Sequence, residues 1–488
     1  MKNIFKIVFV ALLASTYGCK KFLDVNENQD SVRAVGMNLQ LPGAQASMAG
    51  TFGGSFHNLG SFWAQYSTQS PDAGQYEDMD SYRVTTDEFD REWSEVYTGA
   101  LENLRNIKDE ANATGATNYA LVATLCESYT FQMLADLYNE IPYSEALAGA
   151  ANTTPKFDNG ADIYPAIISK IDEAIAAYEA NPSTNDLSTA DIIFAGDMDQ
   201  WIRFANTLKL KMYMRQSYTS SPKGAEINAL LTEDNFLTAD ASMSSFGSGE
   251  GQRNPYYEIQ VDRLGDVNNR ASNTMIKFLR DSLPVDDRLD VLYMAGGSAH
   301  QAKEQGDFAN RDISSDDLSI PYYEATTPVY FITMTELHFL KAEAMVRYAA
   351  GAGAQAEYEA GIDASFAMHG LSTSSSFYGA GNKYAYNATG DVETDIAQIM
   401  MQKWVAMCNS QNLEAFFEVN RTQQPPLSTN AQGTPGNIGE RTLSYASVLS
   451  GTATPRRLSV PDVEVVRNSN APSQPANGLA TKVWWDQK

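Results

Sequence analysis

The side chains that could do chemistry in this sequence are few and scattered. The sequence contains no zinc-protease HExxH, no GxSxG nucleophile elbow, no phosphate-binding loop and no dinucleotide fingerprint. The adjacent acids Asp286 and Asp287 are expected to point apart rather than to act as a glycosidase pair. The histidines have no metal-ligand spacing, and they are His57, His300, His338 and His369. We therefore predict no catalytic residue, no cofactor and no metal site.

Aromatic side chains in polar, loop-like sequence are better candidates for a binding site. They lie in two stretches, 62–82 and 241–272. Aromatic faces stack on sugar rings or peptide planes, while amides and carboxylates bond to hydroxyls and amides. The candidate ligand-binding residues are Trp63, Tyr66, Gln75, Tyr76, Asp80, Tyr82, Asn254, Tyr256 and Tyr257. A shared, solvent-facing site requires the fold to bring the two stretches together. The alternative is that each ring fills the core under its loop.

The elements that must position these residues are helices. Residues 116–138 are apolar on more than one face, which is typical of a helix packed on several sides. Asp199 is the expected N-cap of a helix over 201–216. Helices come in antiparallel-looking pairs, which predicts a mainly helical chain with pairs similar to tetratricopeptide repeats but with irregular spacing. Further helices are expected over 163–180 and 334–349, and long loops over 241–272, 370–391 and 420–442.

The N-terminal sequence has the pattern of a secretory signal peptide. Residues 1–19 are MKNIFKIVFVALLASTYGC, with Lys2 and Lys6 before a short apolar run that ends at Gly18 and Cys19. The pattern resembles a bacterial lipoprotein signal, in which the peptide is cut before an acylated cysteine. We therefore expect a signal peptide over 1–18, lipidation of Cys19 and a single domain over 19–488. An ordinary secretory signal with an incidental cysteine is the alternative.

Composition narrows the classes of partner. The formal net charge of −25 repels nucleic acid, whose binding needs clustered Lys and Arg. No apolar run in the body of the chain is long enough to span a membrane. Apart from Cys19, the cysteines are Cys126 and Cys408, both in apolar helical sequence, where a free buried thiol is the default and a disulfide the alternative.

Several segments together resemble one known family. They are Phe22 to Asn26 (FLDVN), Asp136 to Ala146 (DLYNEIPYSEA), Gly196 to Leu210 with its GD, Trp and FANTLKL, Ala342 to Ala344 (AEA), Gln402 to Trp404 (QKW), and Pro455 to the closing Trp484-Trp485-Asp486. Their order is similar to that of the SusD-like (SusD/RagB) outer-membrane nutrient-binding lipoproteins of Bacteroidetes. Each motif alone is weak, but together they extend over nearly the whole chain.

This resemblance implies a fold and a function. The expected fold is all-α, with about four tetratricopeptide-like helix pairs under a loop-rich binding face. The expected function is capture of a glycan or a peptide at the outer cell surface. The expected partner is a SusC-like TonB-dependent transporter barrel, on which the lipoprotein sits as a lid. A protein-interaction scaffold made of helical repeats is the alternative, and a surface hydrolase is a third.

Overall fold

The computed structural model describes residues 36–282, 284–372 and 377–488. Cys19 and the expected signal peptide lie outside them. The helices are α2 (Met37–Phe52), α3 (Ser55–Trp63), α4 (Glu77–Asp80), α5 (Asp90–Glu95), α6 (Glu102–Thr114), α7 (Thr117–Tyr138), α8 (Gly160–Ala180), α9 (Met198–Arg215), α10 (Gly224–Glu233), α11 (Asn273–Arg280), α12 (Leu289–Leu292), α13 (Met334–Tyr348), α14 (Ala354–Met368), α15 (Val392–Met407), α16 (Asn412–Thr422) and α17 (Asp462–Arg467).

The strands are short, and each pairs with one partner in antiparallel register. They are β1 (Ser67–Gln69) with β5 (Asn269–Ala271), β2 (Glu140–Pro142) with β3 (Phe157–Asn159), β4 (Ala241–Met243) with β8 (Val329–Ile332), and β6 (Tyr293–Met294) with β7 (Ile320–Pro321). The strands therefore fasten loops to one another. They form no large sheet over the part of the chain that the structure describes.

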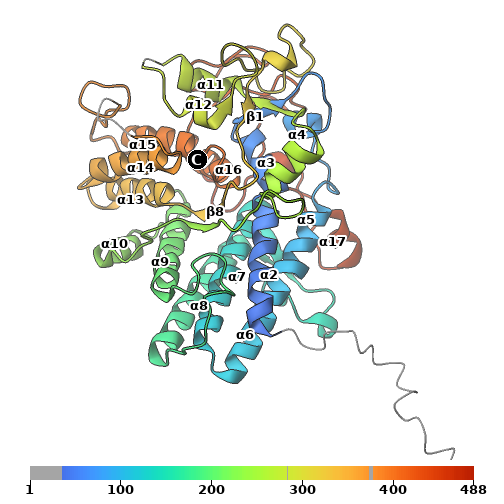
Figure 1. Cartoon of the computed structure of the whole chain (residues 1–488), viewed down its shortest axis with the longest axis vertical. Coiled ribbons are helices and arrows are strands. Elements are labelled where there is room, and N and C mark those ends of the chain that lie inside the picture. The colour runs from blue at the N-terminus through green and yellow to red at the C-terminus, as the bar shows by residue number, and fades with distance from the viewer. Residues whose placement is uncertain (1–35, 283, 373–376) are drawn as a thin grey trace, which may run out of the picture.

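Four successive helix pairs form the scaffold, namely α6 with α7, α8 with α9, α13 with α14, and α15 with α16. Figure 1 shows them along the lower and left parts of the molecule, with α11, α12, α4 and long loops gathered at the top. The predicted all-α fold with tetratricopeptide-like pairs is therefore confirmed. Helix α7 is buried around almost its whole circumference, as its apolar pattern predicts.

Two local predictions need correction. Asp197, and not Asp199, caps α9, because its extended backbone lets its carboxylate accept from the Gln200 N–H at 3.1 Å. The stretch 241–272 is not a plain loop, since it contains β4, β5 and a helical segment over Tyr257–Arg263. Cys126 and Cys408 are both buried free thiols, so they form no disulfide.

A network of buried charges lies where the helix pairs converge, and we call it the buried charge network. Its carboxylates are Asp136 on α7, Glu336 and Glu343 on α13, and Glu414 and Glu418 on α16. Its cations are Lys211 and Arg215 on α9, Lys403 on α15 and Arg421 on α16, with Arg347 on α13 at the rim. Five acids thus meet five bases drawn from five helices.

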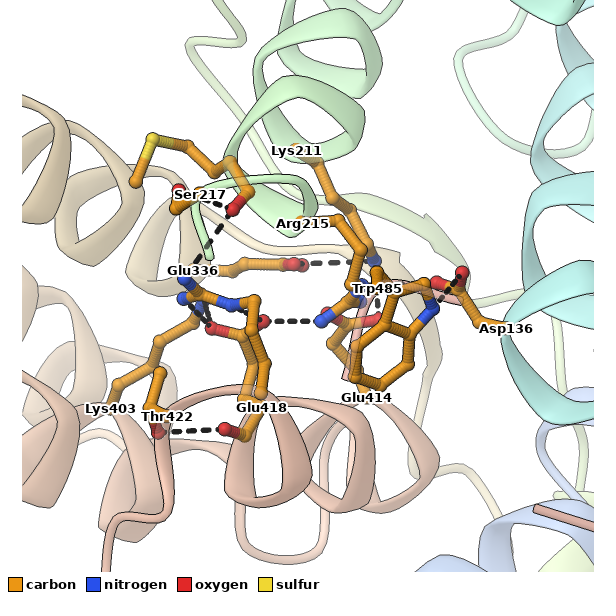
Figure 2. A network of polar contacts seen from close by, with 12 residues as sticks. Asp136, Lys211, Arg215, Ser217, Glu336, Lys403, Glu414, Glu418, Thr422 and Trp485 are labelled. Atoms are coloured by element: carbon orange, nitrogen blue, oxygen red, sulfur yellow. Dashed lines mark hydrogen bonds and ion pairs between the residues drawn. The ribbon is translucent and has the colours of Figure 1, made fainter. Parts of the chain in front are cut away.

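Arg215 is the centre of this network (Figure 2). Its Nε lies 3.0 Å from Asp136 Oδ2, and its two other guanidinium nitrogens pair with Glu414 and Glu418. Arg421 reaches both Glu343 and Glu418 at 2.6 Å. Burial alone would raise the pKa of Glu418, but the charges of Arg421, Lys403 and Arg215 hold it well below its usual range.

Replacing Arg215 by Met should destabilise the chain strongly. The change leaves buried carboxylates without their cation, and breaking a buried pair in this way costs about 3–5 kcal/mol. The measurement is the free energy of unfolding in urea. Arg83→Met is the matched control, because Arg83 pairs with Asp78 on the surface, where its side chain is 57% exposed. Equal losses in the two variants would contradict the central role of Arg215.

Candidate functional site

The two aromatic stretches predicted from the sequence do come together. Strand β1 of the first pairs with β5 of the second, with Ser67 opposite Ala271. Gln260 Nε2 donates to the Tyr76 hydroxyl at 2.7 Å. The fold therefore meets the first requirement for a shared site, although the contact is made inside the protein.

The expectation that these rings face solvent is not met. Five are buried, with exposed fractions of 4% or less for Trp63, Tyr66, Tyr82 and Tyr256 and of 9% for Tyr76. Their polar atoms bond internally instead: Trp63 Nε1 donates to Met79 O at 3.2 Å, and the Tyr66 hydroxyl donates to Trp404 O. The rings fill the core under loops that fold over them, and a hydrogen-bonded phenol or indole is stable there.

The other predicted residues divide between internal and exposed positions. Asn254 is buried, and its Oδ1 accepts from the N–H groups of Tyr256 and Tyr257 at 2.9 and 3.0 Å, so it orders the turn. Of the nine candidates, only Gln75 is exposed and only Tyr257 is half-buried. These two can reach a ligand from the loop surface without rearrangement. The ligand-binding role of the nine residues stays a prediction.

The buried carboxylate of Asp80 holds neighbouring loops together through hydrogen bonds. Its carboxylate accepts from Thr68 Oγ1 at 2.7 Å, Gln69 N at 2.9 Å and Gly306 N at 3.1 Å, and also from Gln305 Nε2. These bonds stabilise its anion, but burial outweighs them and raises the pKa of Asp80 to about 6.

This raised pKa predicts a pH-dependent stability. Between its unfolded pKa of 3.8 and about 6, the folded chain holds the Asp80 proton more tightly than the unfolded chain. The stabilising contribution of Asp80 to the free energy of unfolding is therefore fully present below pH 3.8 and is lost as pH rises through 6. At about 1.4 kcal/mol per pKa unit, the loss is roughly 3 kcal/mol.

Asp80→Asn should remove this loss. The urea concentration at the midpoint of unfolding, measured from pH 4 to 7, should fall for the wild type relative to the variant. Asp78→Asn is the control, because Asp78 is on the surface and 54% exposed, so its curve should parallel the wild type. An Asp80→Asn curve parallel to the wild type would show that Asp80 is not the titrating group.

A solvent-open cleft lies elsewhere, lined by residues between Val291 and Ser410, and we call it the Tyr322 cleft. The segment after β7, the end of α14 and the turn between α15 and α16 form its walls. Its volume is about 310 Å³, within the range of small-ligand sites. Tyr322 is 44% exposed, and it is the only aromatic among the large exposed apolar side chains of the described ranges.

Polar groups surround this ring. The Tyr322 hydroxyl donates to Glu324 Oε1 at 2.8 Å, which fixes the ring at the edge of the cleft. Tyr330 is half-buried, and burial raises its pKa to about 12. Asn409 and Ser410 line the opposite wall, and Asn409 adopts a left-handed φ of 62°, which Asn tolerates better than most residues. The Asn409 amide is buried and donates to Leu292 O at 2.6 Å, so the cleft offers an aromatic face, hydroxyls and one acid.

A smaller cavity adjoins the cleft and shares Pro328, Tyr330, Asn409 and Ser410 with it. Its volume is about 20 Å³, enough for one water molecule. His57 forms part of its lining, and its Nε2 lies 2.7 Å from the Tyr323 hydroxyl and 3.0 Å from Asn412 Nδ2. Burial lowers the pKa of His57 to about 3, so the ring stays neutral and accepts from Asn412.

Close backbone packing holds this cavity in shape. A Cβ on Gly60 would lie 2.3 Å from the backbone of Asn412 and Leu413, so only glycine lets α3 approach α16 this closely. This approach places His57 of α3 beside Asn412 of α16.

The adjacent acids Asp286 and Asp287 do not face one another. Asp286 is buried and Asp287 is exposed, so the two carboxylates point apart as expected. Burial raises the pKa of Asp286, but the charge and hydrogen bonds of Arg288 outweigh it and lower the pKa to about 2. Within residues 36–282, 284–372 and 377–488, no group of three or more His, Cys, Asp or Glu is placed to hold a metal ion.

Sequence reasoning missed the Tyr322 cleft. The segment from Ile320 to Tyr330, IPYYEATTPVY, has the same mixture of aromatic and polar residues and proline as the stretches that were singled out. That composition could have found it. The contribution of Asn409 and Ser410 could not be found, because it depends on how the turn after α15 packs.

Comparison with known proteins identifies the family. A family model named SusD-like and described as "Starch-binding associating with outer membrane" matches residues 32–442. The chain belongs to the SusD-like family. A search of curated proteins finds no match. None of the helices in the described part of this SusD-like chain is long and apolar enough to cross a membrane.

Solved structures of SusD homologs share the fold. One from Bacteroides uniformis is 20% identical, with a TM-score of 0.78 over 92% of this chain and 99% of that chain. One from Bacteroides thetaiotaomicron is 21% identical, with a TM-score of 0.73 over 93% and 100%. A chitin-binding SusD homolog from Flavobacterium johnsoniae is 18% identical, with a TM-score of 0.73 over 91% and 98%.

Proposed function

We propose that this SusD-like chain is a cell-surface lipoprotein that captures a neutral glycan and passes it to a SusC-like TonB-dependent barrel, over which it acts as a lid. Membership of a family described as starch-binding and outer-membrane-associated supports surface glycan binding. The chitin-binding homolog of similar fold supports a sugar ligand as well. We propose no catalytic step, since binding and release suffice for this role.

The observation that carries the proposal is the exposed ring of Tyr322 at the mouth of a polar cleft. An aromatic face can stack on the apolar face of a pyranose, and the flanking hydroxyls can bond to sugar hydroxyls. The lining has no Lys or Arg. Burial and the charge of Arg288 lower the pKa of His369 to about 4, so this lining residue is neutral too. A neutral hydroxylated ligand suits these walls better than an anionic one.

Tyr322→Ala should weaken glycan binding by about tenfold or more, since aromatic anchors typically contribute 1–3 kcal/mol or more. Isothermal titration with maltohexaose and chitohexaose measures the dissociation constants. Because the Tyr322 side chain is exposed and its hydroxyl bonds to nearby Glu324, the melting temperature should stay nearly constant.

Tyr257→Ala is the comparison variant, because Tyr257 is the half-buried ring on the face predicted from the sequence. If Tyr257→Ala weakens binding and Tyr322→Ala does not, the loop face is the site and the Tyr322 cleft is not. If neither oligosaccharide binds the wild type while a peptide does, the chain is a peptide-binding scaffold instead.

The lipid anchor has its own test. Cys19→Ala should leave the chain unacylated and release it from outer-membrane fractions, since acyl chains contribute about 0.8 kcal/mol per buried methylene. Labelling with a radioactive fatty acid followed by fractionation measures both effects. Cys126→Ala is the matched control, because Cys126 is a buried thiol inside α7. Acylation that persists in Cys19→Ala would exclude Cys19 as the anchor.

A further inference from the structure

A second cleft lies between α8, the end of α9, the start of α10 and the C-terminal segment. We call it the Trp484 cleft. Its volume is about 630 Å³, which is larger than the Tyr322 cleft, and the two share no lining residue. The family relation and the proposed transport role leave this cleft without an assignment.

Three half-buried aromatic side chains line it, namely Tyr213, Tyr218 and Trp484. Trp484 packs edge-on against Tyr164 at a ring distance of 4.8 Å, and its backbone N–H donates to Asn139 Oδ1 at 2.7 Å. A Cβ on residue 160 would lie 2.4 Å from the indole, so Gly160 lets the ring approach the start of α8 closely.

Tyr218 is equally well fixed. Its hydroxyl donates to Glu393 Oε2 at 2.7 Å, and the guanidinium of Arg347 lies 4.3 Å from its ring centre. The rings of Trp484 and Tyr218 are therefore both held in place before any ligand binds, which lowers the conformational entropy lost on binding.

The polar groups of the cleft are free to bond to a ligand. The Tyr213 hydroxyl, the hydroxyls of Ser220 and Ser221, and the Oε1 atoms of Gln216 and Gln487 have no hydrogen-bond partner within the three described ranges. Lys223 and Glu226 add one charge of each sign. The cleft thus combines aromatic surface with unpaired hydroxyl and amide groups and has no net charge.

We propose that the Trp484 cleft is a second binding site for a neutral oligosaccharide. The inference rests on the proposed function, because it assigns the same class of ligand to a second site on the chain. Cations would favour a cleft with excess acid, and anions a cleft with excess base, whereas this lining has neither. Two separate sites on one chain let a long glycan bind at both, which raises the overall affinity without new contacts at either.

Trp484 itself provides a direct readout. The chain has six tryptophans, and the other five, Trp63, Trp93, Trp201, Trp404 and Trp485, are buried. Acrylamide should therefore quench mainly Trp484, and a sugar in this cleft should protect it. The experiment uses the full chain in the Tyr322→Ala background, so that the first cleft does not contribute, with maltohexaose and chitohexaose as probes.

We expect saturable protection of the fluorescence by at least one probe. Tyr213→Ala should weaken that protection about tenfold. Gln487→Ala, on an exposed side chain that leaves the fold intact, should weaken it by about threefold, as expected for loss of one hydrogen bond. Tyr178→Ala is the matched control, because Tyr178 is a half-buried tyrosine of α8 outside the cleft, and it should change nothing.

The outcomes separate this inference from the proposed function. Sugar binding to the wild type that Tyr322→Ala abolishes, with no protection of Trp484, contradicts the second site alone. Protection that is unchanged in Tyr213→Ala and Gln487→Ala also contradicts it. Absence of sugar binding to the wild type contradicts both proposals.

Discussion

The arrangement of helices depends on one interaction, the pairing of buried charges around Arg215. Removing charged groups from water costs several kcal/mol each, so such a cluster is stable only when every charge meets its partner. Here Arg215 meets carboxylates from α7 and α16, while Arg421 connects α16 to α13. A shift of any of these helices by one turn would leave buried ions unpaired. The network therefore selects one register of the helix pairs from among others that would bury similar apolar area.

The same network positions the walls of both clefts. Glu414, which pairs with Arg215, also lines the cavity that adjoins the Tyr322 cleft. At the opposite side, Trp485 donates to Asp136 at 2.8 Å, and this bond fixes the C-terminal segment that carries Trp484. Arg347 pairs with Glu343 and lies over the ring of Tyr218. Rigid charged contacts in the centre thus set the positions of aromatic rings at the surface.

The sequence predicts the scaffold better than the site for a physical reason. Helical periodicity is a local property, so α7, α8, α9 and α13 could be recognised from spacing alone. Exposure of an aromatic ring depends on which distant segment covers it. The sequence predicts that Tyr256 is exposed. In the structure, Tyr323 stacks on it at 4.1 Å and Asn269 donates to its hydroxyl. The buried charge network could not be predicted from the sequence either, because charged residues on helices usually face water.

Charge also favours the neutral ligands that we propose for this chain. It has 35 basic and 60 acidic residues, and the buried network pairs acids with an equal number of bases, so the excess of acid lies outside it. The remaining surface is strongly negative, which lowers the association rate of anionic ligands and requires compensating cations wherever one binds. The Tyr322 cleft offers no basic side chain, and the Trp484 cleft offers one that is balanced by Glu226. Neutral sugars avoid this repulsion, and stacking on tyrosine and tryptophan does not depend on the charge of the chain.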